Sequence, residues 1–323
     1  MDLLFLGTSS GTPTRTRNVS GLALLEDTGK GWYLIDCGEA TQHQILRTPL
    51  TLHGLRAIFI THVHGDHCYG LPGLLASAGM ARRLEPLEIV APAAIESWVR
   101  ATLQMSQSHL PYELVFHATE SLNNWRNQQV SVKATTLSHR VPSWGYSFTE
   151  TRPDPRLNTE KLDLEAIPRG PLWGELMRGN DAIFEGRSLR SEDYLLFTRS
   201  PRRIVIAGDN DDPELLRNAC TNAQVLVHEA TYTQPIAEAG KADFGHSTAA
   251  QVATFAEDVG IANLILTHFS ARYQPVSGRA LSIDDIRAEA TARYNGKLFL
   301  AEDFMQLTLD KRAELLLRTE AER

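Results

Sequence analysis

Short apolar runs alternate along the chain with longer segments of helical periodicity, and most of the runs end in Gly, Asp, His or Glu. Short runs rich in β-branched residues predict buried strands, whereas apolar residues that recur every three or four positions predict helices. This alternation is typical of an α/β fold with mixed sheets. The predicted strands are residues 2–6, 19–25, 32–38, 57–60, 87–90, 129–137, 203–209, 224–231 and 263–268, and the predicted helices are residues 39–47, 71–83, 93–105 and 247–259, the last with Ser247 as N-cap.

Two segments depart from this alternation. Residues 151–200 contain several prolines and glycines between short polar stretches and have a weak basic bias, which predicts an inserted arm that projects from the sheets. The tail, residues 310–323, is charged and predicts a helix. No internal repeat or long linker divides the chain, so residues 1–323 are interpreted as one domain that carries the arm.

Composition bounds the class of protein. At 323 residues with 42% apolar content, the chain can bury a sizeable core. The net charge of −7 gives no overall support to nucleic-acid binding, although a local basic surface could still contact phosphate. The N-terminus lacks the basic start of a signal peptide, and no apolar stretch is long enough to span a membrane. Three separated cysteines, Cys37, Cys68 and Cys220, suit a reducing compartment, so we expect a cytoplasmic protein.

Four potential metal ligands lie within six residues, directly after the predicted strand 57–60. His62 and His64 project to the same side of an extended loop and can hold one ion together, which leaves Asp66 and His67 for a second ion. Such a cluster of imidazoles and a carboxylate after a strand predicts a metal site much more strongly than a lone histidine does.

Further candidates stand at other strand ends, where His, Asp or Glu recurs. They complete two ligand sets: His62, His64 and His139 on one ion, Asp66, His67 and His268 on the other, and Asp209 between them. Imidazole and carboxylate without thiolate favour zinc, and manganese stays possible. Asp36 is expected to accept a hydrogen bond from a metal-bound imidazole. Two adjacent ions activate water for attack at phosphorus or at a carbonyl, so the pattern predicts a hydrolase.

These residues belong to a longer series of motifs through which the chain resembles the metallo-β-lactamase superfamily and, within it, the tRNase Z (ribonuclease Z) family. The histidine–aspartate run alone specifies only the superfamily, whereas the later motifs are more restrictive. The series comprises residues 5–11 with 13–15, 36–39 with 41–42, 61–75, 138–139, 168–172, 208–209, 228–231, 245–248, and 267–268 with 272–273.

The resemblance implies an αββα sandwich of two mixed β-sheets flanked by helices, and a zinc-dependent endoribonuclease that removes the 3′ trailer of precursor tRNA and leaves a 3′-hydroxyl. It implies two zinc ions per subunit and a homodimer whose arm, residues 151–200, clasps the tRNA. Asp66 would act as general base, and His246, held by Glu229, would act as proton donor. Candidate substrate contacts are Arg15, Arg17, Gly170, Pro171 and Arg272.

Two residues depart from the family pattern without removing a ligand: Asn210 stands where threonine is usual, and Ala40 where glycine is usual. Two other functions also stay open. The same metal site could hydrolyse a small phosphodiester, sulfate ester or lactone, or the chain could be a metal-containing RNA-binding protein without catalysis. The predicted arm argues against a small substrate, and the complete ligand set argues against a protein without catalysis.

Overall fold

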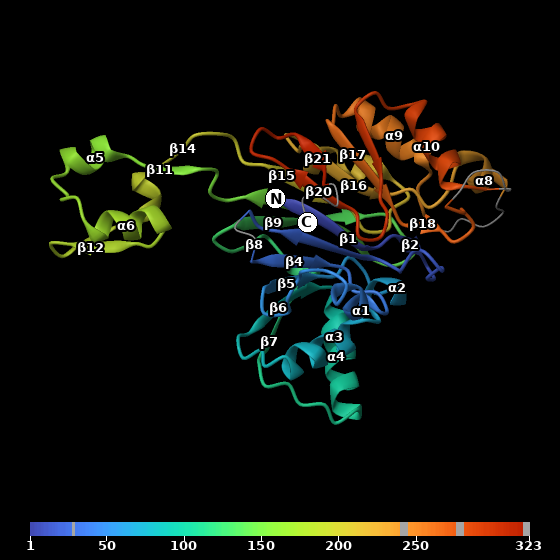
Figure 1. The fold of residues 1–323 in the computed structure, drawn as a ribbon, viewed down its shortest axis with the longest axis horizontal. Coiled ribbons are helices and arrows are strands. Elements are labelled where there is room, and N and C mark those ends of the chain that lie inside the picture. The colour runs from blue at the N-terminus through green and yellow to red at the C-terminus, as the bar shows by residue number, and fades with distance from the viewer. Residues whose placement is uncertain (28–29, 240–244, 276–280, 319–323) are drawn as a thin grey trace.

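The computed structural model describes residues 1–27, 30–239, 245–275 and 281–318, and its frame is a pair of β-sheets packed face to face (Figure 1). The first sheet has the strand order β21-β20-β1-β3-β4-β5-β6-β7, and the second β19-β17-β16-β15-β10-β9-β8. Strands of the first sheet are β1 (Asp2–Gly7), β3 (Gly21–Leu25), β4 (Trp32–Ile35), β5 (Leu55–Phe59), β6 (Leu87–Ala91), β7 (Leu114–Ala118), β20 (Gln306–Leu309) and β21 (Leu315–Leu317). Those of the second are β8 (Trp125–Arg126), β9 (Val130–Leu137), β10 (Ser143–Glu150), β15 (Arg203–Ile206), β16 (Val225–Glu229), β17 (Asn263–Thr267) and β19 (Lys297–Leu300).

Helices cover the outer face of each sheet, which makes four layers. The inner apolar faces of the two sheets meet in one core, with Phe59, Tyr146 and Phe148 at its centre. A second core lies between the first sheet and its helices, and a third lies between the second sheet and its helices. The helices are α1 (Thr41–Ile45), α2 (Gly65–Cys68), α3 (Leu71–Met80) and α4 (Ala93–Met105), then η3 (Pro213–Leu216), α7 (Arg217–Cys220), α8 (Gln234–Ala239), α9 (Ala249–Asp258) and α10 (Ile283–Thr291). A short turn, η1 (Thr119–Ser121), and a small sheet of β2 (Ser9–Ser10) with β18 (Phe269–Ser270) complete the body.

Each sheet is antiparallel on one side and parallel on the other. In the first sheet β4, β5, β6 and β7 run parallel, and in the second β15, β16, β17 and β19 do. The carboxyl ends of parallel neighbours meet at one edge of a sheet, so the residues that follow β5, β15, β16 and β17 are brought to the same side of the sandwich. Asp209, Glu229 and His268 therefore gather at one place, although about twenty to forty residues separate each from the next along the chain.

The predicted α/β sandwich with mixed sheets is confirmed, with differences at several boundaries. Helix α9 begins one residue later than predicted: Thr248 rather than Ser247 is the N-cap, because its side chain accepts from Gln251 N and forms a capping box with that residue. The prediction of a helical tail is wrong for the described part, since residues 315–317 add β21 to the edge of the first sheet. Residues 319–323 lie outside the described residues.

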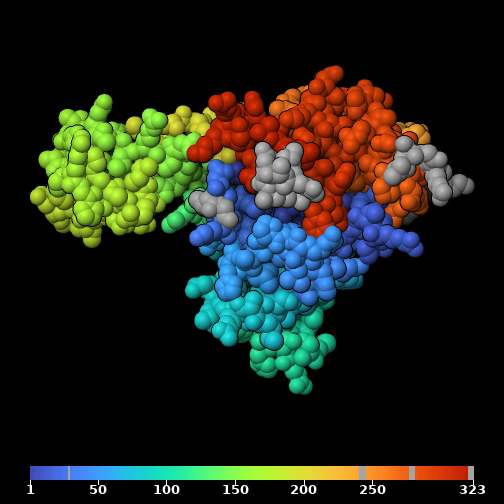
Figure 2. Space-filling view, viewed as in Figure 1, coloured from blue at the N-terminus to red at the C-terminus, as the bar shows by residue number. Residues whose placement is uncertain are grey.

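Residues 155–197 form a small lobe beside the sandwich (Figures 1 and 2). Its elements are β11 (Pro155–Leu157), α5 (Thr159–Leu164), α6 (Pro171–Arg178), β12 (Ala182–Phe184), β13 (Arg187–Leu189), η2 (Ser191–Tyr194) and β14 (Leu195–Phe197). The lobe has its own apolar cluster, made by Leu162, Ile167, Leu176, Leu189 and Tyr194. In Figure 1 it lies at the far left of the body, whereas α2, β2 and β18 lie at the right.

An ion-pair cluster lies where the lobe joins the sandwich. Glu150, at the end of β10, is 2.6 Å from Arg199 and 2.9 Å from Arg202. Arg202 is almost completely buried and also donates to the carbonyl of Leu309. Although burial raises the pKa of Glu150, the two arginines lower it to about 2.

Across the described ranges, no helix is long and apolar enough to cross a membrane.

Candidate metal centre

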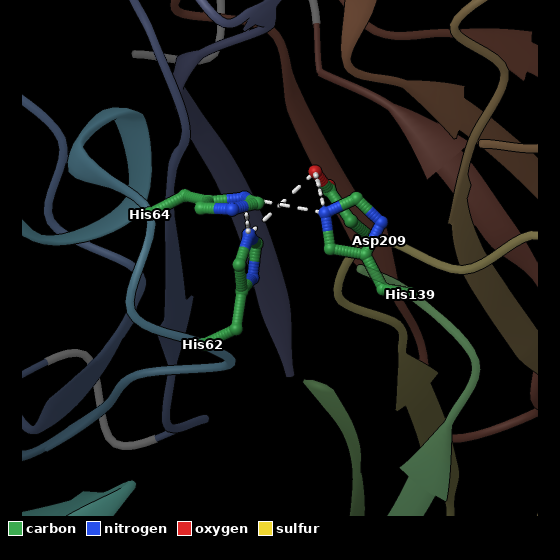
Figure 3. A group of neighbouring side chains, drawn as sticks. All are labelled: His62, His64, His139 and Asp209. Carbon is green, nitrogen blue, oxygen red and sulfur yellow. Dashed lines mark hydrogen bonds and ion pairs between the residues drawn. The ribbon is translucent and has the colours of Figure 1, made fainter. Parts of the chain in front are cut away.

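The loop after β5 places His62 and His64 next to His139 and Asp209, which follow β9 and β15 of the other sheet (Figure 3). His62 Nε2 lies 3.1 Å from His64 Nδ1, which in turn lies 3.2 Å from His139 Nε2. His64 directly precedes the short helix α2 and faces the other two rings with its Nδ1. With Asp209, these residues have ligand atoms that all lie within 4.8 Å of one another.

A second group is formed by Asp66, His67 and His268. His67 Nε2 and His268 Nε2 are 3.2 Å apart, and Asp66 Oδ2 is 3.5 Å from the former and 3.4 Å from the latter. Asp66 and His67 both lie in α2, whereas His268 follows β17 in a left-handed conformation with φ 57°. A histidine is rarely held in this region, and such backbone strain is concentrated at functional sites.

Asp209 lies between the two groups and turns one oxygen to each. Its Oδ2 is 3.6 Å from His62 Nε2 and 3.8 Å from His139 Nε2. Its Oδ1 is 3.4 Å from both His67 Nε2 and His268 Nε2. The structure therefore brings all seven predicted ligands together, in the two sets expected from the sequence and with Asp209 between them.

In four of these imidazoles, hydrogen bonds at Nδ1 direct the Nε2 atom towards the centre of the site. His67 Nδ1 is 2.7 Å from the carboxylate of Asp36, and His139 Nδ1 is 2.6 Å from the carbonyl of Gly245. Both partners can only accept, so each Nδ1 carries a proton, and each ring presents a lone pair at Nε2 when it is neutral.

Two threonine hydroxyls likewise keep the Nδ1 proton on His62 and His268. Thr61 Oγ1 donates to Asp36 and lies 3.0 Å from His62 Nδ1, while Thr231 Oγ1 donates to Glu229 and lies 3.1 Å from His268 Nδ1. Because each hydroxyl has one proton, it must accept from the imidazole. Lone pairs that face each other at about 3 Å repel unless a cation lies between them, so the donor set fits two divalent ions.

The electrostatics of the site also favour cations. Burial by itself lowers the pKa of His67, but the carboxylates of Asp209, Asp36 and Asp66 raise it well above its usual range. Burial raises the pKa of Asp209 and Asp66, yet the surrounding imidazoles hold both pKa values below the ordinary range. Both carboxyl groups are therefore ionised, and the field at the centre of the site attracts positive charge.

Asp66 has a further partner on the rim. The backbone N–H of Gly11, in the loop after β2, donates to Asp66 Oδ2 at 2.7 Å. Gly11 has φ +69°, a conformation that glycine adopts without strain. The loop thus covers one side of the site and fixes the orientation of the Asp66 carboxylate.

Glu229 and His246 form a pair beside the ligand groups. His246 Nδ1 lies 2.9 Å from Glu229 Oε1 and 3.1 Å from Oε2, and it is 3.8 Å from Asp209 Oδ2. Burial lowers the pKa of His246, but the Glu229 carboxylate raises it to about 9. The imidazole is protonated at neutral pH and can donate a proton close to the ligand groups.

The candidate substrate contacts are spread over two parts of the molecule. Arg15 and Arg272 are exposed on the body, and the Arg272 guanidinium lies 5.9 Å from the ring centroid of Tyr232, which in turn neighbours His246. Arg17 is buried and donates to the carbonyls of Ser270 and Tyr273, so it holds the loop in place. Gly170 and Pro171 are exposed at the start of α6 in the lobe, on a part of the chain distant from the ligands.

Sequence reasoning missed several contributors to this site. Thr61, Thr231 and the carbonyl of Gly245 orient the imidazoles, and the Gly11 N–H holds Asp66. Thr61 and Thr231 lie within the motifs at residues 61–75 and 228–231, which was a usable signal. Backbone groups, in contrast, give no signal in a sequence.

Comparison with known proteins decides the family. Ribonuclease Z of Pseudomonas putida (strain GB-1) is 56% identical over 311 residues, which are 96% of this chain and 98% of that protein. The chain belongs to the ribonuclease Z family. Ribonuclease Z of Marinobacter nauticus is 49% identical over 317 residues, 98% of each protein.

Structural comparison agrees with membership of the ribonuclease Z family. The crystal structure of human tRNase Z, short form (ELAC1), has a TM-score of 0.65 and 27% identity, and the match covers 95% of this chain and 99% of the human one. Residues 1–141 also match the family model described as anti-Pycsar protein Apyc1. The fold is therefore the metallo-β-lactamase sandwich that the sequence motifs implied.

Proposed function

We propose that this protein is an endoribonuclease that uses two divalent metal ions, preferably zinc, to remove the 3′ trailer of precursor tRNA and leave a 3′-hydroxyl. The observation that supports this most directly is the two-sided position of Asp209 between two sets of inward lone pairs, next to the Glu229–His246 pair. Two ions held there would activate a water molecule and neutralise negative charge on the phosphate.

Three residues of the chain would move or hold protons during cleavage. Asp66 would hold the attacking water and take its proton; its low pKa makes orientation of the water the larger part of this role. Water attacks phosphorus as the bond to the 3′-oxygen breaks. His246, protonated because of Glu229, would donate its proton to that oxygen, and the trailer would leave with the phosphate.

The lobe at residues 155–197 would bind the tRNA at a distance from the cut. Its exposed arginines include Arg169 and Arg178, which can contact phosphates through charge, with Gly170 and Pro171 between them. The lobe lies at the opposite end of the body from α2, so it could reach the substrate of a partner subunit in a homodimer. Arg15 and Arg272 remain the candidates for phosphate contacts close to the site.

Three buried free cysteines suit a reducing, cytoplasmic setting.

A cleavage assay with a 3′-extended precursor tRNA tests the proposal. The purified protein with zinc should release one trailer and leave mature tRNA with a 3′-hydroxyl, and a chelator should abolish the reaction. Asp66→Ala should lower turnover while tRNA affinity persists. No trimmed product from the wild-type protein, together with rapid turnover of bis(p-nitrophenyl) phosphate, would instead identify a hydrolase of small esters.

A further inference from the structure

Asn210 follows the central ligand Asp209 and is completely buried, yet none of the functions above uses it. Its backbone N–H donates to Glu229 Oε1 at 2.8 Å, and its carbonyl accepts from Ser247 Oγ at 2.6 Å. Its side chain accepts from Ser138 N at 3.2 Å and has Nδ2 3.1 Å from His228 Nε2. One residue thus contacts three segments, each next to a residue of the site.

The orientation of the Asn210 amide is fixed by His228. Burial lowers the pKa of His228, so its ring is neutral. Its Nδ1 lies 2.8 Å from the carbonyl of Glu229 and must donate, which leaves Nε2 to accept from Asn210 Nδ2. The amide oxygen then points to Ser138 N, as that contact requires.

We propose that Asn210 is a positioning residue that holds the Glu229–His246 pair at a fixed place relative to the metal ligands. Through Glu229 it fixes the acceptor of the His246 proton, through Ser247 it holds the residue that follows His246, and through Ser138 it holds the residue that precedes His139. His228 completes this arrangement by fixing the amide. The inference rests on the proposed role of His246 as proton donor to the leaving oxygen.

Comparing turnover of precursor tRNA with turnover of bis(p-nitrophenyl) phosphate distinguishes proton donation from the other steps of the reaction. Breaking the bond to a ribose 3′-oxygen requires a proton, whereas p-nitrophenolate leaves without one. Asn210→Leu keeps the size of the side chain and removes its hydrogen bonds to Ser138, Asp212 and His228. The backbone of residue 210, which contacts Glu229 and Ser247, is then no longer held in place, so kcat on precursor tRNA should fall by about 10- to 100-fold. Turnover of bis(p-nitrophenyl) phosphate, KM for tRNA and bound metal measured by mass spectrometry should stay close to wild type. Asn210→Ser provides a milder variant if the leucine prevents folding.

Asn263 provides a matched control, because it is also a buried asparagine whose Nδ2 donates to a single carbonyl, that of Gln224, at 2.8 Å. Asn263→Ser should lower thermal stability about as much as Asn210→Ser and leave both activities unchanged. An equal loss on both substrates, or a loss of metal in step with the rate, would mean that Asn210 supports the ligands alone and would overturn the inference. Unchanged kcat in both Asn210 variants would overturn it too.

A spectroscopic measurement is independent of the substrate. In protein labelled with ¹⁵N-histidine, the His228 ring should show a single tautomer protonated at Nδ1, assigned by comparison with His228→Gln. Because the Glu229 carbonyl keeps the proton on Nδ1, Asn210→Ser should leave this tautomer in place and shift only the Nε2 signal, which loses the donor Asn210 Nδ2. An unchanged Nε2 signal would contradict the inference. If the wild-type protein trims no precursor tRNA, only the proposed function fails. The Nε2 signal of His228 then still shows whether Asn210 donates to that ring.

Discussion

Ala40 has a left-handed backbone, with φ 60° and ψ 7°, at the residue before α1. An L-residue with a Cβ pays about 1–2 kcal/mol for this conformation. The turn is nevertheless required, because Thr41 must fold back so that its hydroxyl donates to the Gly38 carbonyl at 2.8 Å. The same segment lies against the stretch that carries His62, His64, Asp66 and His67, where Cys37 N donates to the carbonyl of His67 at 2.8 Å. Replacing Ala40 by glycine should relieve the strain and leave these contacts in place.

The expected size of the effect follows from three contributions. Glycine removes about 1–2 kcal/mol of strain and costs about 0.4–1 kcal/mol through the greater freedom of the unfolded chain. The methyl group of Ala40 is exposed, so its removal loses little burial. Ala40→Gly should therefore increase the free energy of unfolding by about 0.5–1 kcal/mol.

Urea denaturation measures this change directly, and Ala94→Gly is the matched control. Ala94 is also exposed but lies in the first turns of α4, where glycine should cost about 0.5–1 kcal/mol. The two substitutions are chemically identical and should act in opposite directions. A loss of stability at both positions would refute the reasoning. Trimming of precursor tRNA should be the same in Ala40→Gly as in the wild type, because the turn keeps its conformation.

Three further predictions concern the candidate metal centre and the ion-pair cluster of Glu150, where the lobe joins the sandwich. Asp209→Asn should lower the number of bound metal ions measured by mass spectrometry, because the amide nitrogen cannot serve as a ligand, whereas Asp211→Asn should bind metal normally; two ions retained in Asp209→Asn would contradict the bridging position. Glu229→Gln should lower kcat on precursor tRNA about 100-fold with little change in tRNA affinity, since His246 loses the charge that keeps it protonated, and equal losses in rate and affinity would count against proton donation. Glu150 has a pKa lowered to about 2, so its ion pairs stabilise the fold above its unfolded pKa and are lost as the pH falls towards 2. The difference in unfolding free energy between wild type and Glu150→Gln should thus be about 1–2 kcal/mol near pH 6 and shrink towards pH 3, and a difference that does not change with pH would exclude this explanation.

The grouping of the seven candidate ligands could be predicted from sequence because they stand in segments that follow strands, and the carboxyl ends of parallel neighbouring strands meet at one edge of a sheet. The apolar runs before His62, Asp209 and His268 carried that information. Asp36 could be placed next to an imidazole because a metal-bound histidine normally donates its other N–H to a carboxylate or carbonyl, and the structure puts Asp36 2.7 Å from His67.

Other features left no such signal. Ser247 and Thr248 are both good N-caps, and the choice between them depends on Ser247 donating to Asn210, a contact between segments 37 residues apart. The tail carries charges that suit a helix, but Leu315–Leu317 pairs with β20, so tertiary context overrides local preference there. Asn210 was recognisable only as an unusual residue after Asp209, because its four contacts come from segments that the sequence keeps apart.

Asp209 and His268 come from the second sheet, whereas His62, His64, Asp66 and His67 come from the first. Neither sheet provides all the candidate ligands of either ion. Bound ions would therefore link the two sheets of the sandwich, and their binding free energy would add to the stability of the whole fold. The last ligand is His268, which is made only after more than four fifths of the chain. A growing polypeptide therefore cannot complete this hydrolytic site for RNA before residue 268 has been synthesised.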